Sequence, residues 1–190
     1  MKVPATLQFL GTGSSWGVPV IGCQCAICQS AHPKNRRSRP SALLKVGSKA
    51  FLIDAGPDLR EQALRFHIDH LDGVLLTHTH YDHTGGIDDL RIFYLKAKKA
   101  LPCLLSTVSA PDIRARFAYM LRPQPLEIKE TPRLKLIEIG EERGERVFEG
   151  IVVRFFSYKQ LEMPVLGFRF GSLAYVTDIK AFSGDIYDEL

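Results

Sequence analysis

Short apolar runs, each ended by glycine, proline or polar turn residues, recur along the chain and predict β-strands. The predicted strands cover residues 6–10, 42–46, 50–54, 73–77, 102–105, 134–139, 150–156, 165–170 and 173–177. The pairs Gly47-Ser48 and Gly171-Ser172 each lie between two of these runs, so we expect a tight hairpin turn at each.

Apolar residues at helical spacing fall between these hairpins rather than after every strand. A helix is expected just after Pro57, with Leu59, Ala63, Leu64 and Phe66 as its buried face. Further helices are expected over 86–98, over 111–120 and from about 183. The helix over 86–98 is expected to bury Ile87, Leu90, Ile92, Phe93 and Leu95. This order indicates sheets covered on the outside by helices, not a doubly wound parallel sheet.

Composition narrows the class of protein. The chain has 190 residues, of which 45% are hydrophobic and 24% charged. This length predicts one domain over 1–190, and the many apolar residues argue against a disordered chain. Glycine, proline and glutamine interrupt the longest uncharged stretch, and the N-terminus lacks a secretory signal pattern. We therefore expect a cytoplasmic protein with no membrane partner.

Positive charge is concentrated in the first third of the chain. The residues before Asp54 include seven bases and no acid, whereas the remainder has 18 bases and 21 acids. A basic segment attracts anionic ligands such as phosphate esters. A solvated surface loop over residues 34–39 would explain the same charges, so both interpretations stay open.

Three of the six histidines lie within residues 78–83, which read HTHYDH. His78 and His80 are two residues apart after a predicted strand, so extended backbone would point both the same way. The turn that follows can direct Asp82 and His83 at a second site nearby. Imidazole and carboxylate groups suit zinc, manganese or iron, so the run predicts a metal site.

The cysteines predict a second metal site. Cys23, Cys25 and Cys28 lie within six residues, and in a cytoplasmic chain this spacing favours zinc over disulfides. A closed zinc site needs a fourth ligand, for which His32 is one candidate. Reduced thiols without metal are the alternative. Cys103, within an apolar run, is expected to be a core residue.

Several motifs together resemble one family. The run HTHYDH resembles the H-x-H-x-D-H signature of the metallo-β-lactamase superfamily, as do LIDAG at 52–56 and YVTD at 175–178. GTG at 11–13, GVP at 17–19, the cysteine spacing and PVLGFR at 164–169 are similar to its phosphoribosyl cyclic phosphate phosphodiesterase subfamily. The resemblance covers essentially the whole chain.

The resemblance implies an αββα sandwich and two divalent metals, zinc or manganese, in one active site. The implied metal ligands are His78, His80, Asp82, His83 and Asp178. It also implies a supporting role for Asp54 behind the metal loop, catalytic roles for Asp54 and Asp82, and a structural zinc at Cys23, Cys25 and Cys28. A distant C-terminal histidine would complete the cysteine site.

The chain departs from the family pattern in its C-terminal half. No histidine follows His83, although two further histidines usually complete the two-metal centre. Gln160 stands where one of them is expected, and its amide oxygen is a weaker ligand for zinc. The other would lie beyond residue 190, so we expect the last strand and helix of the fold to be missing.

The preferred function is a phosphodiesterase that cleaves a small cyclic or diester phosphate with a metal-bridged hydroxide. Its partner would be a small anionic phosphate ester. Nucleic-acid processing, as in tRNA 3′-processing endonucleases, is an alternative, but the chain lacks a long basic arm and nucleic acid is disfavoured. Similarity to pyrroloquinoline quinone biosynthesis proteins and an inactive, truncated remnant that binds metal weakly are further alternatives. A homodimer is compatible with the sequence.

Overall fold

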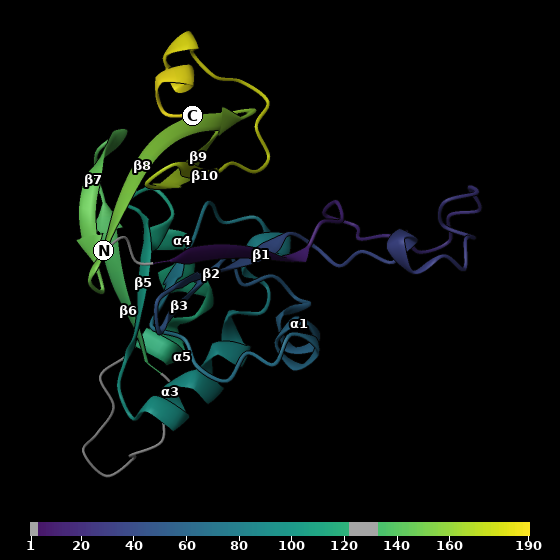
Figure 1. Ribbon diagram of the computed structural model, residues 1–190, viewed down its shortest axis with the longest axis horizontal. Coiled ribbons are helices and arrows are strands. Elements are labelled where there is room, and N and C mark those ends of the chain that lie inside the picture. Colours follow the sequence, from purple (N-terminus) through teal and green to yellow (C-terminus); the bar gives the residue numbers. More distant parts are fainter. Residues whose placement is uncertain (1–3, 122–132) are drawn as a thin grey trace.

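The computed structural model describes residues 4–121 and 133–190 of the chain. Its core consists of two β-sheets packed face to face, with helices on the outer face of the larger one (Figure 1). The larger sheet has the order β1 (Ala5–Gly11), β2 (Ser41–Val46), β3 (Lys49–Ile53), β4 (Gly73–Leu75), β5 (Leu101–Ser106) and β6 (Leu134–Ile139). The smaller sheet has the order β10 (Leu173–Tyr175), β9 (Met163–Phe170), β8 (Ile151–Gln160) and β7 (Arg143–Phe148).

The helices are short. They are η1 (Pro33–Asn35), α1 (Leu59–Arg65), α2 (Tyr81–Thr84), η2 (Ile87–Leu90), α3 (Arg91–Ala97), α4 (Ala110–Arg116), α5 (Ala118–Leu121) and η3 (Gly184–Asp188), the η elements being 3-10 helices. No helix in the described ranges is both long and apolar enough to span a membrane.

Alternation of side chains along the central strands builds two cores. On β3, Leu52 faces the helices with Leu59 and Phe93, whereas Phe51 and Ile53 face the smaller sheet. Successive residues of a strand point to opposite faces, so a strand covered on both sides is apolar throughout. This two-sided burial agrees with the predicted αββα sandwich. On the outer face of the smaller sheet, Ile186 of η3 packs with Phe156.

The predicted strands and both hairpins are confirmed, with ends shifted by at most four residues. The segment that forms β7 was not predicted as a strand, because its sequence RGERVF is mostly polar. β7 is an edge strand, and four of its six side chains are exposed. Such a strand carries little of the apolar pattern that identifies strands from sequence.

The helix predictions need correction. The region 86–98 forms η2 followed by α3, and Ile92 and Leu95 are exposed rather than inward. A helix of seven residues resting on a sheet buries only one stripe, and here Phe93 occupies it. Leu64 on α1 is likewise 58% exposed. The helix over 111–120 is interrupted at Phe117, and the expected C-terminal helix is a short 3-10 helix.

One segment leaves the compact body. Residues 12–40, which we call the arm, join β1 to β2 and project from the sheets (Figure 1). The backbones of Val18 and Arg37 hydrogen-bond in both directions at 2.8 Å, so the two sides of the arm are paired near its base. The arm carries Cys23, Cys25 and Cys28, whereas the segment HTHYDH at 78–83 follows β4 in the body.

Candidate metal centre

The candidate metal centre lies where β3, β4 and β10 end. Parallel strands β3 and β4 bring Asp54 and the segment 77–83 to one edge of the large sheet, and β10 is followed by Asp178. The backbone N–H of Leu166 on β9 donates to the carbonyl oxygen of Thr77 at 2.9 Å. This bond ties the smaller sheet to the start of the histidine segment, so the two sheets jointly form the site.

Three side chains converge there, His78, His83 and Asp178, and we call them the His/Asp group. Their candidate ligand atoms all lie within 4.8 Å of one another. His83 Nε2 lies 2.7 Å from Asp178 Oδ2, and His78 Nε2 lies 3.6 Å from the same oxygen. Both imidazoles are fully buried, while the Asp178 side chain is 27% exposed. The group is therefore open to solvent on the Asp178 side.

Asp54 supports this group from behind. Its completely buried carboxylate accepts from His83 Nδ1 at 2.7 Å, from the Thr77 N–H at 2.8 Å and from the Thr77 hydroxyl at 2.8 Å. Donation from Nδ1 leaves His83 Nε2 directed toward Asp178. A histidine ligand is normally oriented by such a bond at its other ring nitrogen.

Close backbone packing fixes the same arrangement. A Cβ at Gly86 would lie 2.0 Å from the carbonyl oxygen of Gly56, so this contact requires glycine. Ala55 N–H donates to the His83 carbonyl, and Gly86 N–H donates to the Ala55 carbonyl, both at 2.8 Å. The Asp54 loop and the histidine segment therefore form one hydrogen-bonded unit.

Both aspartates of the centre have left-handed backbone conformations, with φ of 62° at Asp54 and 53° at Asp178. Non-glycine residues seldom adopt positive φ, and such conformations are frequent at functional sites. Asp54 directly follows β3, and Asp178 lies three residues after the end of β10. The turn there sends both carboxylates toward His83.

His80 and Asp82 lie at the rim. His80 is exposed, and its Nδ1 lies 3.1 Å from His78 Nε2. Asp82 Oδ2 lies 3.3 Å from His83 Nε2. The sequence predicted two separate pairs of ligands, His78 with His80 and Asp82 with His83. In the structure His80 and Asp82 instead flank the two adjacent buried imidazoles.

Electrostatics in the group favours an added cation. Burial lowers the pKa of His78 to about 4, so its imidazole is neutral at pH 7. Burial opposes protonation of His83 as well, but Asp54, Asp178 and Asp82 outweigh it and raise its pKa to about 12. The close contact with His83 lowers the pKa of Asp178. A site with this many carboxylates holds positive charge in the form of a proton or of a metal ion.

The donor set fits a divalent metal. His83 Nε2 and Asp178 Oδ2 are both buried without an aligned hydrogen bond, although they lie 2.7 Å apart. Buried polar atoms without such partners are uncommon in proteins, and nitrogen and carboxylate oxygen are preferred ligands of zinc and manganese. The buried Gln160 Oε1, at the end of β8, likewise has no hydrogen-bond partner in the part of the chain that the structure describes.

Arg116 is a residue of the centre that the sequence did not reveal. From the end of α4 it donates to the carbonyl oxygen of Thr79 at 2.8 Å and to the Thr84 hydroxyl at 3.0 Å. Thr84 in turn donates to the His80 carbonyl at 2.8 Å. No sequence motif marks Arg116, because its role depends on the packing of α4 beside the histidine segment.

The cysteines form a second candidate metal site on the arm. The sulfur atoms of Cys23, Cys25 and Cys28, which we call the Cys group, lie within 4.8 Å of one another. Hydrogen bonds from the Cys28 backbone and the Cys23 side chain lower the pKa of Cys25 to about 7, which favours the metal-binding thiolate. His32 does not join this group, and its Nδ1 instead accepts from the Lys34 N–H at 3.2 Å. Cys103 is buried in β5.

Sequence comparisons place this architecture in a family. Residues 49–190 match the family model for the β-lactamase superfamily domain. The chain is 38% identical over 177 residues to an octanoyltransferase of Porphyromonas gingivalis, covering 93% of this chain and 35% of that protein. It is 30% identical over 139 residues to coenzyme PQQ synthesis protein B of Methylorubrum extorquens, covering 64% and 46%. The chain thus spans less than half the length of either relative.

The solved structures agree. A diphosphatase from the PhnP family superposes with a TM-score of 0.85 at 34% identity, covering 98% of this chain and 70% of that one. Zinc-bound PqqB from Methylobacterium extorquens superposes with a TM-score of 0.71 at 20% identity, covering 98% and 69%, a likeness of fold. The chain therefore belongs to the metallo-β-lactamase superfamily, and within it to the PhnP-like subfamily.

Proposed function

We propose that this chain is a metal-dependent hydrolase, and specifically a phosphodiesterase acting on a small cyclic or diester phosphate. The observation that carries the proposal is the convergence of His78, His83 and Asp178, with Asp54 orienting His83 from behind. Similarity to a PhnP-family diphosphatase supports hydrolysis at a phosphoryl group. We favour a small anionic ester over nucleic acid, because the solved structure that is 34% identical to this chain is a diphosphatase.

The proposed ligands of up to two divalent metals are His78, His80, Asp82, His83 and Asp178, with Gln160 as a weak additional donor. Zinc and manganese both suit this mixture of imidazole and carboxylate. A bound metal would polarise a phosphoryl oxygen and lower the pKa of a water molecule to about 7.

The side chains around the proposed metal site orient its ligands and supply negative charge. Asp54 keeps a proton on His83 Nδ1, so that Nε2 is free to bind metal. Asp178 and Asp82 both have lowered pKa values, because contact with His83 favours their ionised forms, Asp82 against the opposing effect of burial. They contribute negative charge at neutral pH. His80 lies at the exposed rim with its Nδ1 3.1 Å from His78 Nε2, so both imidazoles can bind the same metal ion.

We also propose a structural zinc at the Cys group. Three thiolates supply three of the four ligands that a tetrahedral site requires. The fourth would come from another residue or from solvent, because His32 is directed toward the Lys34 backbone. Such a zinc would hold the tip of the arm, whose described residues contain few buried side chains.

Hydrolysis of bis(p-nitrophenyl) phosphate tests the proposed function. Turnover should require added manganese or zinc, should stop with EDTA, and should fall at least about 100-fold in His83→Ala. His70→Ala is the matched control, since His70 is an exposed histidine that contacts Asp69. Absence of metal-dependent turnover in the wild-type protein would contradict the proposal and favour the inactive remnant.

A further inference from the structure

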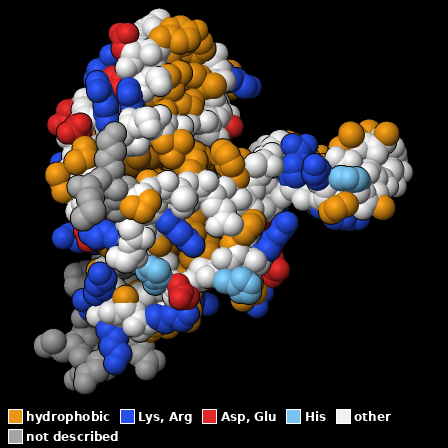
Figure 2. Space-filling model, in the orientation of Figure 1, with side chains coloured by type: hydrophobic (Ala, Val, Ile, Leu, Met, Phe, Trp, Pro, Cys, Tyr) orange, Lys and Arg blue, Asp and Glu red, His pale blue; other side chains and the backbone are white. Residues whose placement is uncertain are grey.

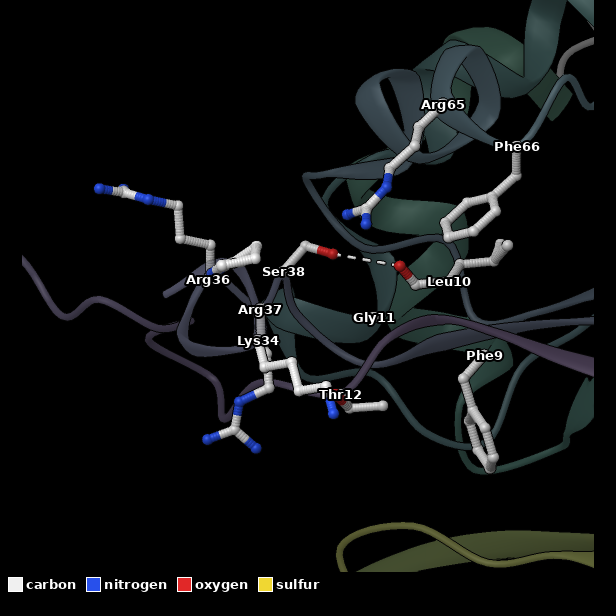
Figure 3. A pocket seen from close by; sticks show the side chains of 11 residues that line it. Phe9, Leu10, Gly11, Thr12, Lys34, Arg36, Arg37, Ser38, Arg65 and Phe66 are labelled. Atoms are coloured by element: carbon white, nitrogen blue, oxygen red, sulfur yellow. Dashed lines mark hydrogen bonds between the residues drawn. The ribbon is translucent and has the colours of Figure 1, made fainter. Parts of the chain in front are cut away.

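A basic pocket lies at the base of the arm, outside the His/Asp group (Figure 3). It has a volume of about 460 Å³ and is bounded by the end of β1, the returning side of the arm and the end of α1. Ser38 joins two of these walls, because its hydroxyl donates to the carbonyl oxygen of Leu10 at 3.3 Å.

All the charged residues that line the pocket are positive. Lys34, Arg36, Arg37 and Arg65 line it, and no acidic residue does. Among residues 4–121 and 133–190, none of these four cations has a carboxylate within salt-bridge distance. Arginines nearby, such as Arg60, are paired with acids. Unpaired cations around a cavity favour a ligand with more than one negative charge.

Two of the four cations point into the pocket. In Figure 3, Arg65 extends from α1 toward Ser38, while Lys34 ends beside Thr12. Arg36 and Arg37 extend outward from the arm, away from the end of α1. Lys34 and Arg65 are therefore the cations best placed to bind a group inside the pocket, whereas the other two add to the local potential. Lysine and arginine side chains of this kind are common ligands of phosphate.

An exposed aromatic ring completes the lining. Phe9, on edge strand β1, is 58% exposed although it is a large apolar residue. On the opposite wall the Arg65 guanidinium lies 5.2 Å from the centre of the Phe66 ring. The Arg65 guanidinium already covers the Phe66 ring, so Phe9 is the lining ring that can stack against a planar base while the cations bind its phosphate.

The basic pocket adjoins the metal centre. Phe9, Gly11 and Thr12 also line a neighbouring pocket of about 490 Å³, and Asp178 of the His/Asp group lines that pocket too. A molecule with one end at Asp178 can therefore extend past Thr12 toward Lys34. Figure 2 shows blue Lys and Arg side chains on the arm, between the body and the tip, where orange apolar side chains gather.

We propose that the basic pocket binds the distal, nucleotide-like part of an elongated phosphoester. Lys34 and Arg65 hold a phosphoryl group and Phe9 stacks against a planar ring, while the phosphate to be cleaved lies at the His/Asp group. The second half of this proposal rests on the proposed function; the first half, binding in the pocket, does not.

Calorimetric titration of metal-free, EDTA-treated protein with ADP and with inorganic pyrophosphate tests the pocket by itself. The double variant Lys34→Gln/Arg65→Gln should bind both anions at least about tenfold more weakly. Phe9→Ala should weaken ADP about three- to tenfold and leave pyrophosphate unchanged, because only ADP carries a ring. Arg60→Gln removes one charge from the same helix outside the pocket and should change either affinity less than about twofold.

Two results would contradict anion binding in this pocket. The double variant could bind both anions as tightly as wild type does, or Arg60→Gln could lose as much affinity as the double variant. Circular dichroism melting of each variant separates loss of binding from loss of folding. On metal-loaded protein, ADP should inhibit hydrolysis of bis(p-nitrophenyl) phosphate by wild type and inhibit the double variant at least about tenfold less. If ADP binds the metal-free protein but wild type hydrolyses nothing, the proposed function fails while the pocket stands.

Discussion

The guanidinium of Arg116 and the carbonyl oxygen of Thr79 lie 2.8 Å apart, which joins helix α4 to the middle of the histidine segment. The same side chain donates to Thr84 and pairs with Asp112 at 2.6 Å. Arg116 thus holds both ends of the turn that carries His80 and His83, without contacting either imidazole in the described contacts. A residue that fixes the backbone of ligands affects metal affinity as well as stability.

Arg116→Ala is therefore expected to weaken metal binding about tenfold while lowering the free energy of unfolding by only about 1–2 kcal/mol. Arg116→Lys should recover part of the affinity, since an ammonium group can still donate to one carbonyl. Competition with a coloured chelator measures the affinity. Arg114→Ala is the control, because that arginine lies on the same helix and pairs with Glu138 instead. Unchanged metal affinity in Arg116→Ala would refute the positioning role.

Asp54→Asn should reduce metal affinity about 10- to 100-fold, because the carboxylate that receives the His83 Nδ1 proton is lost. The control is Asp72→Asn, at the other end of the same strand pair, where the carboxylate accepts from the Ala50 N–H at 2.9 Å. Isothermal titration with zinc compares the two variants. Equal effects would mean that Asp54 has no specific connection to the metal centre.

Metal binding at the His/Asp group should weaken as the pH falls. The neighbouring carboxylates raise the pKa of His83 to about 12 against the effect of burial, so without metal this imidazole keeps its proton at neutral pH. The metal must displace that proton, and affinity should drop about tenfold per pH unit between pH 8 and 6. Calorimetry in two buffers of different ionisation enthalpy counts the released protons. His83→Gln should release about one proton fewer.

The same pKa sets the stability of the metal-free protein. Because the folded-state pKa of His83 lies above its ordinary value of 6.5, its stabilising contribution is complete below about pH 6.5 and is lost as the pH rises toward 12. The free energy of unfolding of the EDTA-treated wild-type protein, measured with denaturant, should therefore fall relative to that of His83→Gln as the pH rises above 7. A wild-type and variant difference that stays constant with pH would contradict this assignment.

Cys25→Ser should lose one zinc per chain relative to wild type, while Cys103→Ser should lose none. Cys25 belongs to the Cys group, whereas Cys103 is buried in β5 and burial raises the pKa of its thiol. Elemental analysis of the two variants provides the comparison. Without metal, iodoacetamide should modify Cys25 from about pH 7, where its thiolate forms, and should leave Cys103 unmodified.

Much of the fold followed from local patterns. The central strands were predictable because β3 and β4 are buried on both faces and read as continuous apolar runs. β7 was not, since the pairing with β8 and not its own composition makes it a strand. The interruption of the helix at Phe117 likewise depends on packing, because Phe117 lies against the helix-side core.

The candidate site was predictable in its residue types and only partly in its arrangement. The spacing of His78, His80, Asp82 and His83 indicated metal chemistry before any geometry was known, and the family resemblance added Asp54 and Asp178. The spacing could not indicate that Arg116 clamps the histidine segment, because that contact joins residues 37 positions apart through the placement of α4. Of the pocket's two main cations, Lys34 belonged to the predicted basic first third of the chain, whereas nothing in the sequence singled out Arg65.

The most direct test is anomalous X-ray diffraction at the zinc edge, using crystals of zinc-saturated protein that hydrolyses bis(p-nitrophenyl) phosphate. We predict anomalous peaks among His78, His83 and Asp178, and a further peak among Cys23, Cys25 and Cys28. Peaks at the Cys group alone, with none at His78, His83 and Asp178, would contradict the account. The hydrolysis would then have to arise elsewhere in the molecule.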